Sequence, residues 1–494
     1  MSGKYLLAID QGTSSSRTVI YDHETRVVAS AQQEFPQHYP QPGWVEHDPE
    51  DIWASVQSVT REAMAATDAR AADISGIGIT NQRETTLIWD RKSGRCVHNA
   101  IVWQDRRTAA QCEALKEQGA EESVSDKTGL RLDPYFSATK IAWILDNVAG
   151  VREKAERGEL AFGTIDSFIL WRLSGGQVHA TDATNASRTL LFNIHTQDWD
   201  DELLALFNVP RSLLAEVHDC ASDFGRTDSE ILGGEVAVCG IAGDQQAALM
   251  GQAGFDEGMT KSTYGTGCFV IANTGASAPK SRNKLLTTVA SRFDGKVTYG
   301  LEGSVFVAGS AIQWLRDSLG IVDSAAATEA IARETGVVDD VYVVPAFAGL
   351  GAPYWDPHAR GAILGLTRGS GQEDIVTATL QAVGFQTRDL IDAMSDDGIS
   401  PSVIRVDGGM AMNDWFLQFL ADILDIPVER PQNIESTVLG AAYLAALQRD
   451  IINSTDELSR LWQSDRVFEP SMPAERRDAL IEGWHLAVTR VRSA

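Results

Sequence analysis

A loop of glycine and hydroxyl residues near the start of the chain has the composition of a phosphate-binding turn. It follows the apolar run Tyr5–Ile9 and contains Asp10, Gly12 and the hydroxyl residues Thr13–Ser16. Glycine lets backbone N–H groups approach an anion closely, and adjacent hydroxyls donate further hydrogen bonds. Asp10 would repel a phosphate directly, but a Mg²⁺ ion between them would bridge carboxylate and phosphate through oxygen ligands. The alternative is an ordinary hairpin turn, which uses the same residue types.

Two further glycine turns follow apolar strands later in the chain. YGTGCF places Gly265 and Thr266 ahead of an apolar run, and VDGGMAMN places Gly408 and Gly409 ahead of a helical pattern. N–H groups at the start of the helix after VDGGMAMN could meet an adenine or a ribose-phosphate. For the first turn a hairpin and a phosphate loop are equally supported, and YGTGCF alone is more typical of a structural turn, but three such turns, each after a strand, reinforce one another. The Walker A pattern is absent from the sequence, as is GxGxxG between a strand and a helix.

Two polar motifs could bind and activate a hydroxyl group. Asp244 in GIAGDQQ follows an apolar run and is a candidate general base, although an aspartate there could instead cap the next helix. Arg83 and Glu84 in NQRETT place a donor beside an acceptor at a strand end, and the alternative is a surface ion pair.

The elements that must position these residues follow an α/β pattern in each half of the chain. Strands are predicted at YLLAI, RTVIYD, RVVASAQQEF and ISGIGIT, with a helix over residues 48–67. The pattern restarts near residue 254. Because 494 residues exceed what one core supports, we expect an N-terminal domain over 1–253 and a C-terminal domain over 254–494. The halves are too different in sequence to establish a duplication.

Composition excludes several classes of protein. The formal charge of −26 opposes non-specific binding to nucleic acid or anionic membranes. The five cysteines are widely spaced and form no CxxC pair, so neither a disulfide framework nor a zinc site is indicated. No apolar run approaches the roughly 18 residues that a membrane span needs. We expect a cytoplasmic protein.

Longer motifs resemble the FGGY family of carbohydrate kinases, a branch of the sugar kinase, Hsp70 and actin ATPase superfamily. DQGTSSSR, YGTG and DGG are similar to the two phosphate loops and the adenosine loop of that superfamily, and YFSATKIAWILDN and GAILGLTRGSGQEDIVTATLQ are similar to the two FGGY signatures. GITNQRETT, NAIVWQDRRT, TNASRTLLFNIHTQDWD, GIAGDQQAAL and PAFAGLGAPYWDPHARG look like the FGGY members that phosphorylate glycerol. The resemblance runs from about Tyr5 to Leu447. It implies two ribonuclease-H-like domains, each a mixed sheet flanked by helices, with a catalytic cleft between them.

The resemblance also implies a reaction and its residues. ATP would phosphorylate glycerol to sn-glycerol 3-phosphate in the presence of Mg²⁺, with Asp244 as general base and Asp10 holding the metal directly or through water. The implied glycerol-binding residues are Arg83, Glu84, Trp103, Tyr135, Asp244, Gln245 and Phe269. The implied ATP-binding residues are Thr13, Ser14, Ser15, Arg17, Gly265, Thr266, Gly309, Gln313, Gly409 and Asn413.

Regulation is where the sequence departs from the family. Some relatives bind fructose 1,6-bisphosphate at a Gly-Gly-x-Arg loop between subunits, but the corresponding stretch here is ILGGEVAV, with Glu235 and no arginine. A carboxylate there would repel a bisphosphate. Other relatives are activated by phosphorylation of a histidine, and none lies between His218 and His358. We expect neither control, and a homodimer and a homotetramer both stay open.

Three alternatives to this function stay open at this point. One is a kinase for another polyol or sugar, although Arg83, Glu84 and Trp103 suit a compact triol. Another is an ATP-driven switch or filament protein with the same nucleotide site, which would hydrolyse ATP without a polyol. The third is a sensor that binds without turnover, and the presence of Asp10 and Asp244 argues against it.

Overall fold

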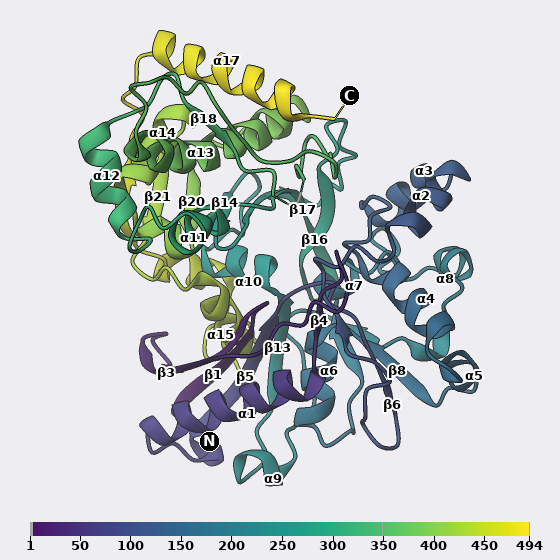
Figure 1. Cartoon of the computed structure of the whole chain (residues 1–494). Helices are drawn as coiled ribbons and strands as arrows, with labels where there is room; N and C mark the ends of the chain where they lie inside the picture. Colours follow the sequence, from purple (N-terminus) through teal and green to yellow (C-terminus); the bar gives the residue numbers. More distant parts are fainter. Residues whose placement is uncertain (1–2, 348, 494) are drawn as a thin grey trace. The chain divides into compact units, whose positions relative to one another are not determined.

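The chain folds into two compact units (Figure 1). The structure, a computed structural model, describes residues 3–347 and 349–493. Unit 1 combines the residues up to Ala253 with Thr287–Tyr299 and Thr437–Ser459, and unit 2 holds the remainder. The units divide after Ala253, but the two later segments of unit 1 interrupt unit 2, so neither unit is one continuous stretch of chain. The domain boundaries expected from the sequence, 1–253 and 254–494, stay a prediction.

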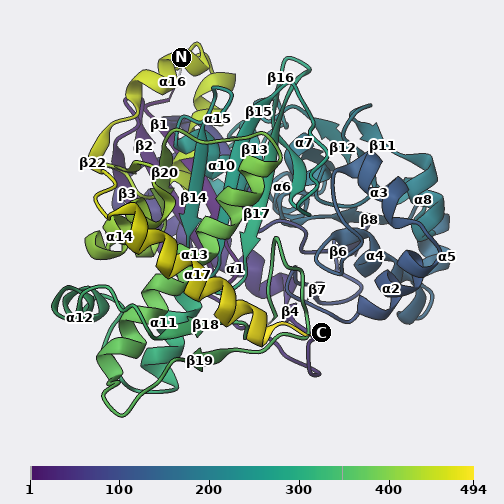
Figure 2. The same ribbon diagram turned by 90° about the horizontal axis from the view of Figure 1, so that it is seen from above.

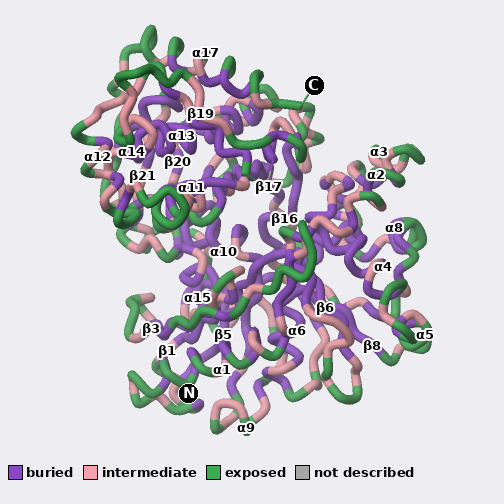
Figure 3. Tube along the Cα trace, viewed as in Figure 1, coloured by how far each residue is buried: buried purple, intermediate pink, exposed green. Residues whose placement is uncertain are grey.

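Unit 1 is built on a mixed five-stranded sheet. Its strand order is β13 (Val238–Gly243), β5 (Ile74–Asn81), β1 (Tyr5–Gln11), β2 (Ser15–Asp22) and β3 (Val27–Glu34). The strands β1, β2 and β3 form an antiparallel meander, whereas β5 and β13 run parallel to β1. The consecutive apolar residues Leu6–Ile9 of β1 are wholly buried, as are Ile77 and Ile79 of β5, which places the core on both faces of this sheet (Figure 3).

Helices pack on this sheet at close range. The helix α1 (Pro49–Ala66) lies within the span expected from the sequence and is capped by Asp48, whose side chain accepts from the Glu50 N–H. The helix α15 (Ser436–Gln448) approaches the strands so closely that a Cβ at Gly78 would lie 1.9 Å from the Ala441 carbonyl oxygen. Glycine in the strand is therefore required for this packing.

The remaining elements of unit 1 are short. The other helices are α2 (Ala109–Glu117), α3 (Glu121–Thr128), α4 (Ser137–Asn147), α5 (Val151–Glu156), α6 (Ile165–Leu173), α7 (Ala183–Ala186), α8 (Asp201–Phe207), α9 (Ser229–Leu232) and α10 (Asp244–Gly251). Four strand pairs accompany them: β4 (Glu46–His47) with β7 (Ala100–Ile101), β6 (Leu87–Asp90) with β8 (Leu160–Gly163), β9 (Ala180–Asp182) with β12 (Glu216–His218), and β10 (Phe192–Asn193) with β11 (Asp198–Trp199).

Unit 2 contains a seven-stranded sheet. Its order is β16 (Leu286–Phe293), β17 (Lys296–Val305), β15 (Cys268–Gly275), β14 (Thr260–Tyr264), β20 (Ile404–Asp407), β21 (Val428–Pro431) and β22 (Ser464–Phe468). Nearly all of β16, the turn after it and the start of β17, residues Thr287–Tyr299, belong to unit 1. The strand β18 (Tyr342–Val344) pairs with β19 (Ala362–Leu364). The helices are α11 (Gly309–Asp317), α12 (Ala327–Thr335), α13 (Gln372–Asp396), α14 (Asp414–Leu424) and α17 (Ala474–Val491), and α16 (Thr455–Leu461) falls at the boundary between the units. Among the helices that the structure describes, none is long and apolar enough to cross a membrane.

The C-terminal helix α17 runs across α13 (Figure 2). Trp484 stacks on Phe385 with ring centroids 5.4 Å apart. The buried Asp389 carboxylate of α13 accepts hydrogen bonds from Trp484 Nε1 at 2.8 Å and from the Tyr354 hydroxyl at 2.9 Å. His485 Nε2 lies 3.1 Å from the other carboxylate oxygen of Asp389. A titratable imidazole therefore takes part in holding α17 to α13.

Because of the contact between His485 and Asp389, we expect the free energy of unfolding to depend on pH. The hydrogen bond to Asp389 raises the pKa of His485 above its ordinary 6.5. A raised pKa means that protonated His485 stabilises the fold below pH 6.5 and that this contribution is lost as pH rises through the folded-state pKa. Wild type should exceed His485→Gln in urea midpoint at about pH 6, and the difference should shrink toward about pH 9. A difference that is constant with pH would contradict the assignment.

Candidate active site

The parallel strands β1, β5 and β13 end at the same level of the unit 1 sheet. Gln11 of β1 is in register with Asn81 of β5, which is in register with Gly243 of β13. Gln82 ties two of the following segments together, because its side-chain amide donates to Gln11 Oε1 at 3.0 Å and to the Gly12 carbonyl at 3.1 Å. The sheet thus brings the first glycine loop, NQRETT and GDQQ to one edge.

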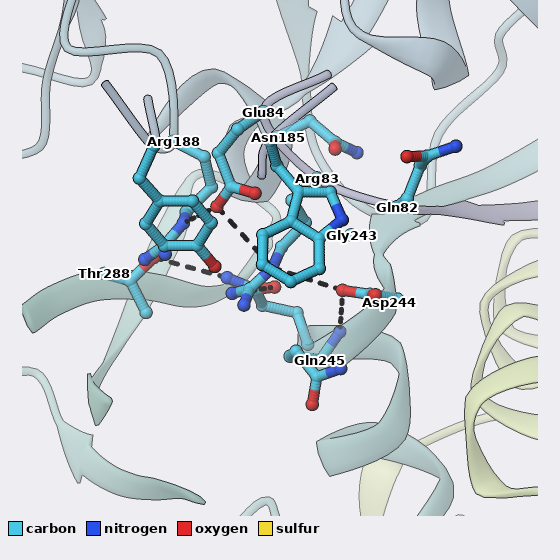
Figure 4. A network of polar contacts seen from close by, with 12 residues as sticks. Gln82, Arg83, Glu84, Asn185, Arg188, Gly243, Asp244, Gln245 and Thr288 are labelled. Carbon is cyan, nitrogen blue, oxygen red and sulfur yellow. Dashed lines mark hydrogen bonds and ion pairs between the residues drawn. The ribbon is translucent and has the colours of Figure 1, made fainter. Parts of the chain in front are cut away.

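Asp244 is the first residue of α10, and Gly243 is the N-cap residue. Asp244 Oδ1 accepts from the Gln245 backbone N–H at 2.7 Å and lies 3.1 Å from Arg83 Nε (Figure 4). The Asp244 side chain is 28% exposed, whereas that of Arg83 is 2% exposed. A carboxylate that is held by a buried guanidinium and still reaches solvent can accept a proton from a bound hydroxyl. The alternative, Asp244 as the N-cap residue, is wrong.

Arg83 and Glu84 are buried, so the alternative of a surface ion pair is also wrong. Arg83 Nε lies 3.9 Å from Glu84 Oε1, and both side chains are 2% exposed. The Glu84 backbone has a φ of 60°, in the left-handed region that non-glycine residues rarely adopt. Its carbonyl oxygen accepts from Ser137 Oγ at 2.9 Å and from Thr86 Oγ1 at 3.0 Å. Strain of this kind persists where surrounding contacts fix the backbone, as they do here.

Two aromatic residues join this group to the first glycine loop. The rings of Trp103 and Tyr135 meet edge to face with centroids 5.6 Å apart. Trp103 Nε1 donates to Thr13 Oγ1 at 2.9 Å. The structure therefore brings six of the seven predicted glycerol-binding residues together in unit 1, including the buried Gln245. Phe269 is the seventh and lies on β15 in unit 2.

The other residues predicted around the first glycine loop lie on β1, on β2 and in the turn between them. Ser14 is exposed at the turn. Ser15 Oγ accepts from the Gln32 side-chain amide at 2.9 Å, and Arg17 Nε donates to Gln32 Oε1 at 3.2 Å. Asp10 is half-buried and lies opposite Arg17 in the β1–β2 ladder. The carboxylate and the hydroxyls predicted to face a nucleotide phosphate thus share one hairpin.

Sequence reasoning gave no role to Arg188, which belongs to the same cluster. Arg188 Nε donates to Glu84 Oε1 at 2.7 Å, and the Arg188 side chain is wholly buried. It follows the four-residue helix α7, far from Glu84 in sequence. The motif TNASRT belonged to the resemblance, but no local pattern shows that its arginine points inward.

The residues predicted for ATP in unit 2 line one pocket of about 460 Å³. They come from three segments: the turn after β14, the start of α11 and the turn after β20. The predicted members are Gly265, Thr266, Gly309, Gln313, Gly409 and Asn413. Sequence reasoning missed further lining residues, among them Ile312, Arg316, Thr328, Glu329, Leu380 and Met410. The pocket thus combines glycine backbone, polar groups and an apolar wall, as small-molecule sites do.

Close backbone approach explains two of the glycines in and beside this pocket. The Gly309 N–H donates to the Gly265 carbonyl at 2.9 Å, and a Cβ on Gly309 would lie 2.5 Å from that oxygen. Gly408 has a φ of 85°, and a Cβ there would lie 2.5 Å from the Tyr264 carbonyl oxygen. The turns therefore pack backbone to backbone, which larger residues would prevent.

The chain belongs to the FGGY family of carbohydrate kinases. The N-terminal domain of that family matches residues 5–251, and its C-terminal domain matches residues 260–449. Similar curated proteins are glycerol kinases: glycerol kinase 1 of Pseudomonas aeruginosa is 60% identical over 99% of both chains, and glycerol kinase of Rhodospirillum centenum is 60% identical over 99% of this chain and 98% of its own.

Solved structures share the whole architecture. The structure of Plasmodium falciparum glycerol kinase with ADP matches with a TM-score of 0.92 and 38% identity, covering 100% of this chain and 99% of that chain. A ligand-bound xylulose kinase from Lactobacillus acidophilus, at 22% identity, shares the fold with a TM-score of 0.87 over 98% of this chain and 97% of that chain. The resemblance and fold class predicted from the sequence are confirmed.

Proposed function

We propose that the chain transfers the γ-phosphate of ATP to glycerol, giving sn-glycerol 3-phosphate and ADP, as the first step of glycerol utilisation. The observation that carries the proposal is the cluster in unit 1, where Asp244 is ion-paired with Arg83 beside Glu84 and two aromatic rings. Full-length relatives at 54–60% identity that are glycerol kinases support the same substrate.

Glycerol needs hydroxyl partners along one side and an apolar wall along its hydrocarbon edge. Arg83 supplies N–H donors, and Glu84 supplies a carboxylate acceptor. Trp103 and Tyr135 supply the apolar surface, and Tyr135 adds a hydroxyl. Asp244 then accepts the proton of the attacking hydroxyl, and its ion pair with Arg83 fixes the orientation of the carboxylate toward that hydroxyl. Phosphoryl transfer requires little covalent chemistry from the protein. We therefore expect most of the rate acceleration to arise from this positioning of the substrate.

The unit 2 pocket is the proposed nucleoside site. Its apolar wall suits a base, and the N–H groups around Gly265, Thr266 and Gly309 suit phosphate oxygens. In unit 1 the hydroxyls of Thr13 and Ser14 are the proposed hydrogen-bond donors to the phosphate groups of ATP.

The residues present fit Mg²⁺. Asp10 is a half-buried carboxylate beside a turn of hydroxyls, an all-oxygen donor set. The part of the chain that the structure describes has no group of three or more His, Cys, Asp or Glu residues able to hold a metal. The cation would therefore share its ligands among Asp10, water and nucleotide phosphate, and when bound it supplies charge neutralisation.

Coupled ADP release tests this function. Wild type receives Mg-ATP alone and then with glycerol, xylulose, gluconate or erythritol. Stimulation by glycerol above the others is the expected result. Stimulation by xylulose or gluconate would keep the fold and overturn the substrate, whereas hydrolysis without a polyol would favour an ATP-driven switch. The cytoplasmic location and the homodimer or homotetramer stay predictions.

Gly309→Ala is expected to weaken ATP binding. The added Cβ must displace the Gly265 backbone, which lines the same pocket. The ATP KM should rise by about tenfold, while glycerol binding measured by calorimetry without nucleotide stays near wild type. Gly369→Ala is the matched control, because a Cβ there meets only Thr367 Oγ1 at 3.7 Å. An unchanged ATP KM in Gly309→Ala would remove this turn from the nucleotide site.

A further inference from the structure

Four charged side chains of alternating sign form a row, and three of them belong to the proposed glycerol site (Figure 4). Asp244 is 3.1 Å from Arg83, Arg83 is 3.9 Å from Glu84, and Glu84 is 2.7 Å from Arg188. All but Asp244 have side chains that are at most 2% exposed. Each buried charge in this row depends on its neighbour, because removing one partner of a buried ion pair leaves an uncompensated charge and strongly destabilises the folded protein.

The distances indicate that each of the two arginines pairs mainly with a different carboxylate. Arg83 Nε is within hydrogen-bond distance of Asp244 but too far from Glu84 Oε1 for a hydrogen bond between those atoms. Arg188 Nε is within hydrogen-bond distance of Glu84 Oε1. Arg188 therefore neutralises the Glu84 carboxylate, and Arg83 keeps its Nε on Asp244.

Arg188 also packs against the aromatic residues of the site. Its guanidinium carbon lies 5.6 Å from the Tyr135 ring centroid and 5.3 Å from that of Phe136. A planar guanidinium stacks on rings and directs its N–H groups at the same time. A further buried basic side chain nearby, Lys140, donates to the carbonyl oxygens of Tyr135 and Phe136. Arg188 thus contacts both Glu84 and Tyr135, which are proposed to bind glycerol from different elements.

A buried polar network fixes the backbone that carries Arg188. Asp182 caps α7 by accepting from the N–H groups of Thr184 and Asn185. Thr184 Oγ1 accepts from the Gly243 N–H at 2.9 Å, and the Asn185 amide donates to Asn81 Oδ1 at 3.1 Å. The helix α7 is therefore bonded to the ends of both β13 and β5. These are the strand ends that present Asp244 and the Arg83–Glu84 pair.

We propose that Arg188 is a positioning residue that sets the affinity and selectivity for glycerol. It holds the Glu84 carboxylate in the orientation that accepts a substrate hydroxyl, and it leaves Arg83 to orient Asp244 and the substrate. The proposal rests on the proposed function. In this role Arg188 acts through Glu84, so its effect is on glycerol binding and on discrimination among polyols rather than on ATP.

Steady-state kinetics of Arg188→Met and Arg188→Lys test the proposal. Arg188→Met should raise the glycerol KM by about tenfold or more, leave the ATP KM within about twofold, and reduce the preference for glycerol over erythritol. Arg188→Lys keeps the charge but not the planar fork, so it should recover part of the loss. The double variant Glu84→Gln/Arg188→Met should show a KM rise below the product of the two single effects, because a neutral amide needs no counter-charge.

Arg107→Met is the matched control. The Arg107 side chain is also wholly buried, pairs with Asp105 at 2.8 Å and lies over the Trp44 ring. Loss of thermal stability with an unchanged glycerol KM is expected for Arg107→Met. A glycerol KM that rises no more in Arg188→Met than in Arg107→Met, or effects that multiply fully in the double variant, would overturn the proposal. If Arg188→Met does not fold, Arg188→Lys with a wild-type glycerol KM overturns it alone. Absence of glycerol-dependent turnover in wild type would instead overturn the proposed function.

Discussion

Asp244→Asn is expected to lower kcat by about 10²- to 10⁴-fold, the range typical of losing a general base. The amide keeps the size of the carboxylate and one oxygen for the Gln245 N–H, which Asp244 Oδ1 binds at 2.7 Å. It cannot accept the proton of the attacking hydroxyl. Glycerol binding, measured by calorimetry, should therefore remain detectable while single-turnover phosphoryl transfer almost disappears.

The control for this variant is Asp48→Asn. Asp48 also stands at a helix start, where it accepts from the Glu50 N–H, and asparagine caps helices about as well. Turnover of Asp48→Asn should stay at the wild-type level. Near-wild-type turnover in Asp244→Asn would remove Asp244 from the role of base and leave the ion pair with Arg83 as a structural feature.

Arg83→Ala should raise the glycerol KM by about 10- to 100-fold, because a charge-assisted donor contributes about 1.5–3 kcal/mol. Its loss leaves the buried Glu84 with a weaker counter-charge and removes the group 3.1 Å from Asp244. The thermal midpoint should fall as well, since removing one partner from a buried pair is costly. Initial-rate kinetics over a range of glycerol concentrations, with scanning calorimetry, measure both effects.

Two variants separate the charge of Arg83 from its geometry. Arg83→Lys keeps the charge and should lie between wild type and alanine. Arg26→Ala removes an arginine that is 72% exposed and paired with Asp22, so its glycerol KM should match wild type. A glycerol KM that is unchanged in Arg83→Ala would place the Arg83–Glu84 pair outside the substrate site.

The sequence predicted the individual loops, but not that they lie together at one end of the unit 1 sheet. The strand, glycine turn and second strand around Gly12 follow from local alternation and turn chemistry, and β1, β2 and their turn lie there. Periodicity cannot tell that β1, β5 and β13 are parallel and end in register, because that depends on pairing across long stretches of chain. The family resemblance, rather than local pattern, connected Arg83 with Asp244.

Burial was the property that local pattern predicted least well. From residue type alone Arg83 and Glu84 suggested a surface pair, yet both are 2% exposed, and Glu84 is hydrogen-bonded to Arg188 and to Ser137 of α4. Arg188 comes from a polar stretch that resembles an ordinary loop in composition. Its burial arises from α7 bonding to two strand ends, a tertiary effect that no window of sequence shows.

Local pattern also did not predict that two later segments of the chain, Thr287–Tyr299 and Thr437–Ser459, belong to unit 1. The helix α15 has apolar residues on most of its surface, which predicts a buried helix but not its location. It packs on the unit 1 strands because Gly78 and Gly240 leave room for Ala441 and Leu444. These contacts join residues more than 200 positions apart in the chain, so the domain prediction at residue 254 could not include them.

The central claim is that this chain transfers phosphate from ATP to glycerol at Asp244. Phosphorus-31 NMR of wild type and Asp244→Asn with Mg-ATP and glycerol tests it directly, because each phosphate group gives its own signal. The account predicts ADP and sn-glycerol 3-phosphate in equal amounts with wild type, and neither over the same time with Asp244→Asn. Inorganic phosphate in place of the phosphate ester, or equal ester formation by both proteins, would contradict it.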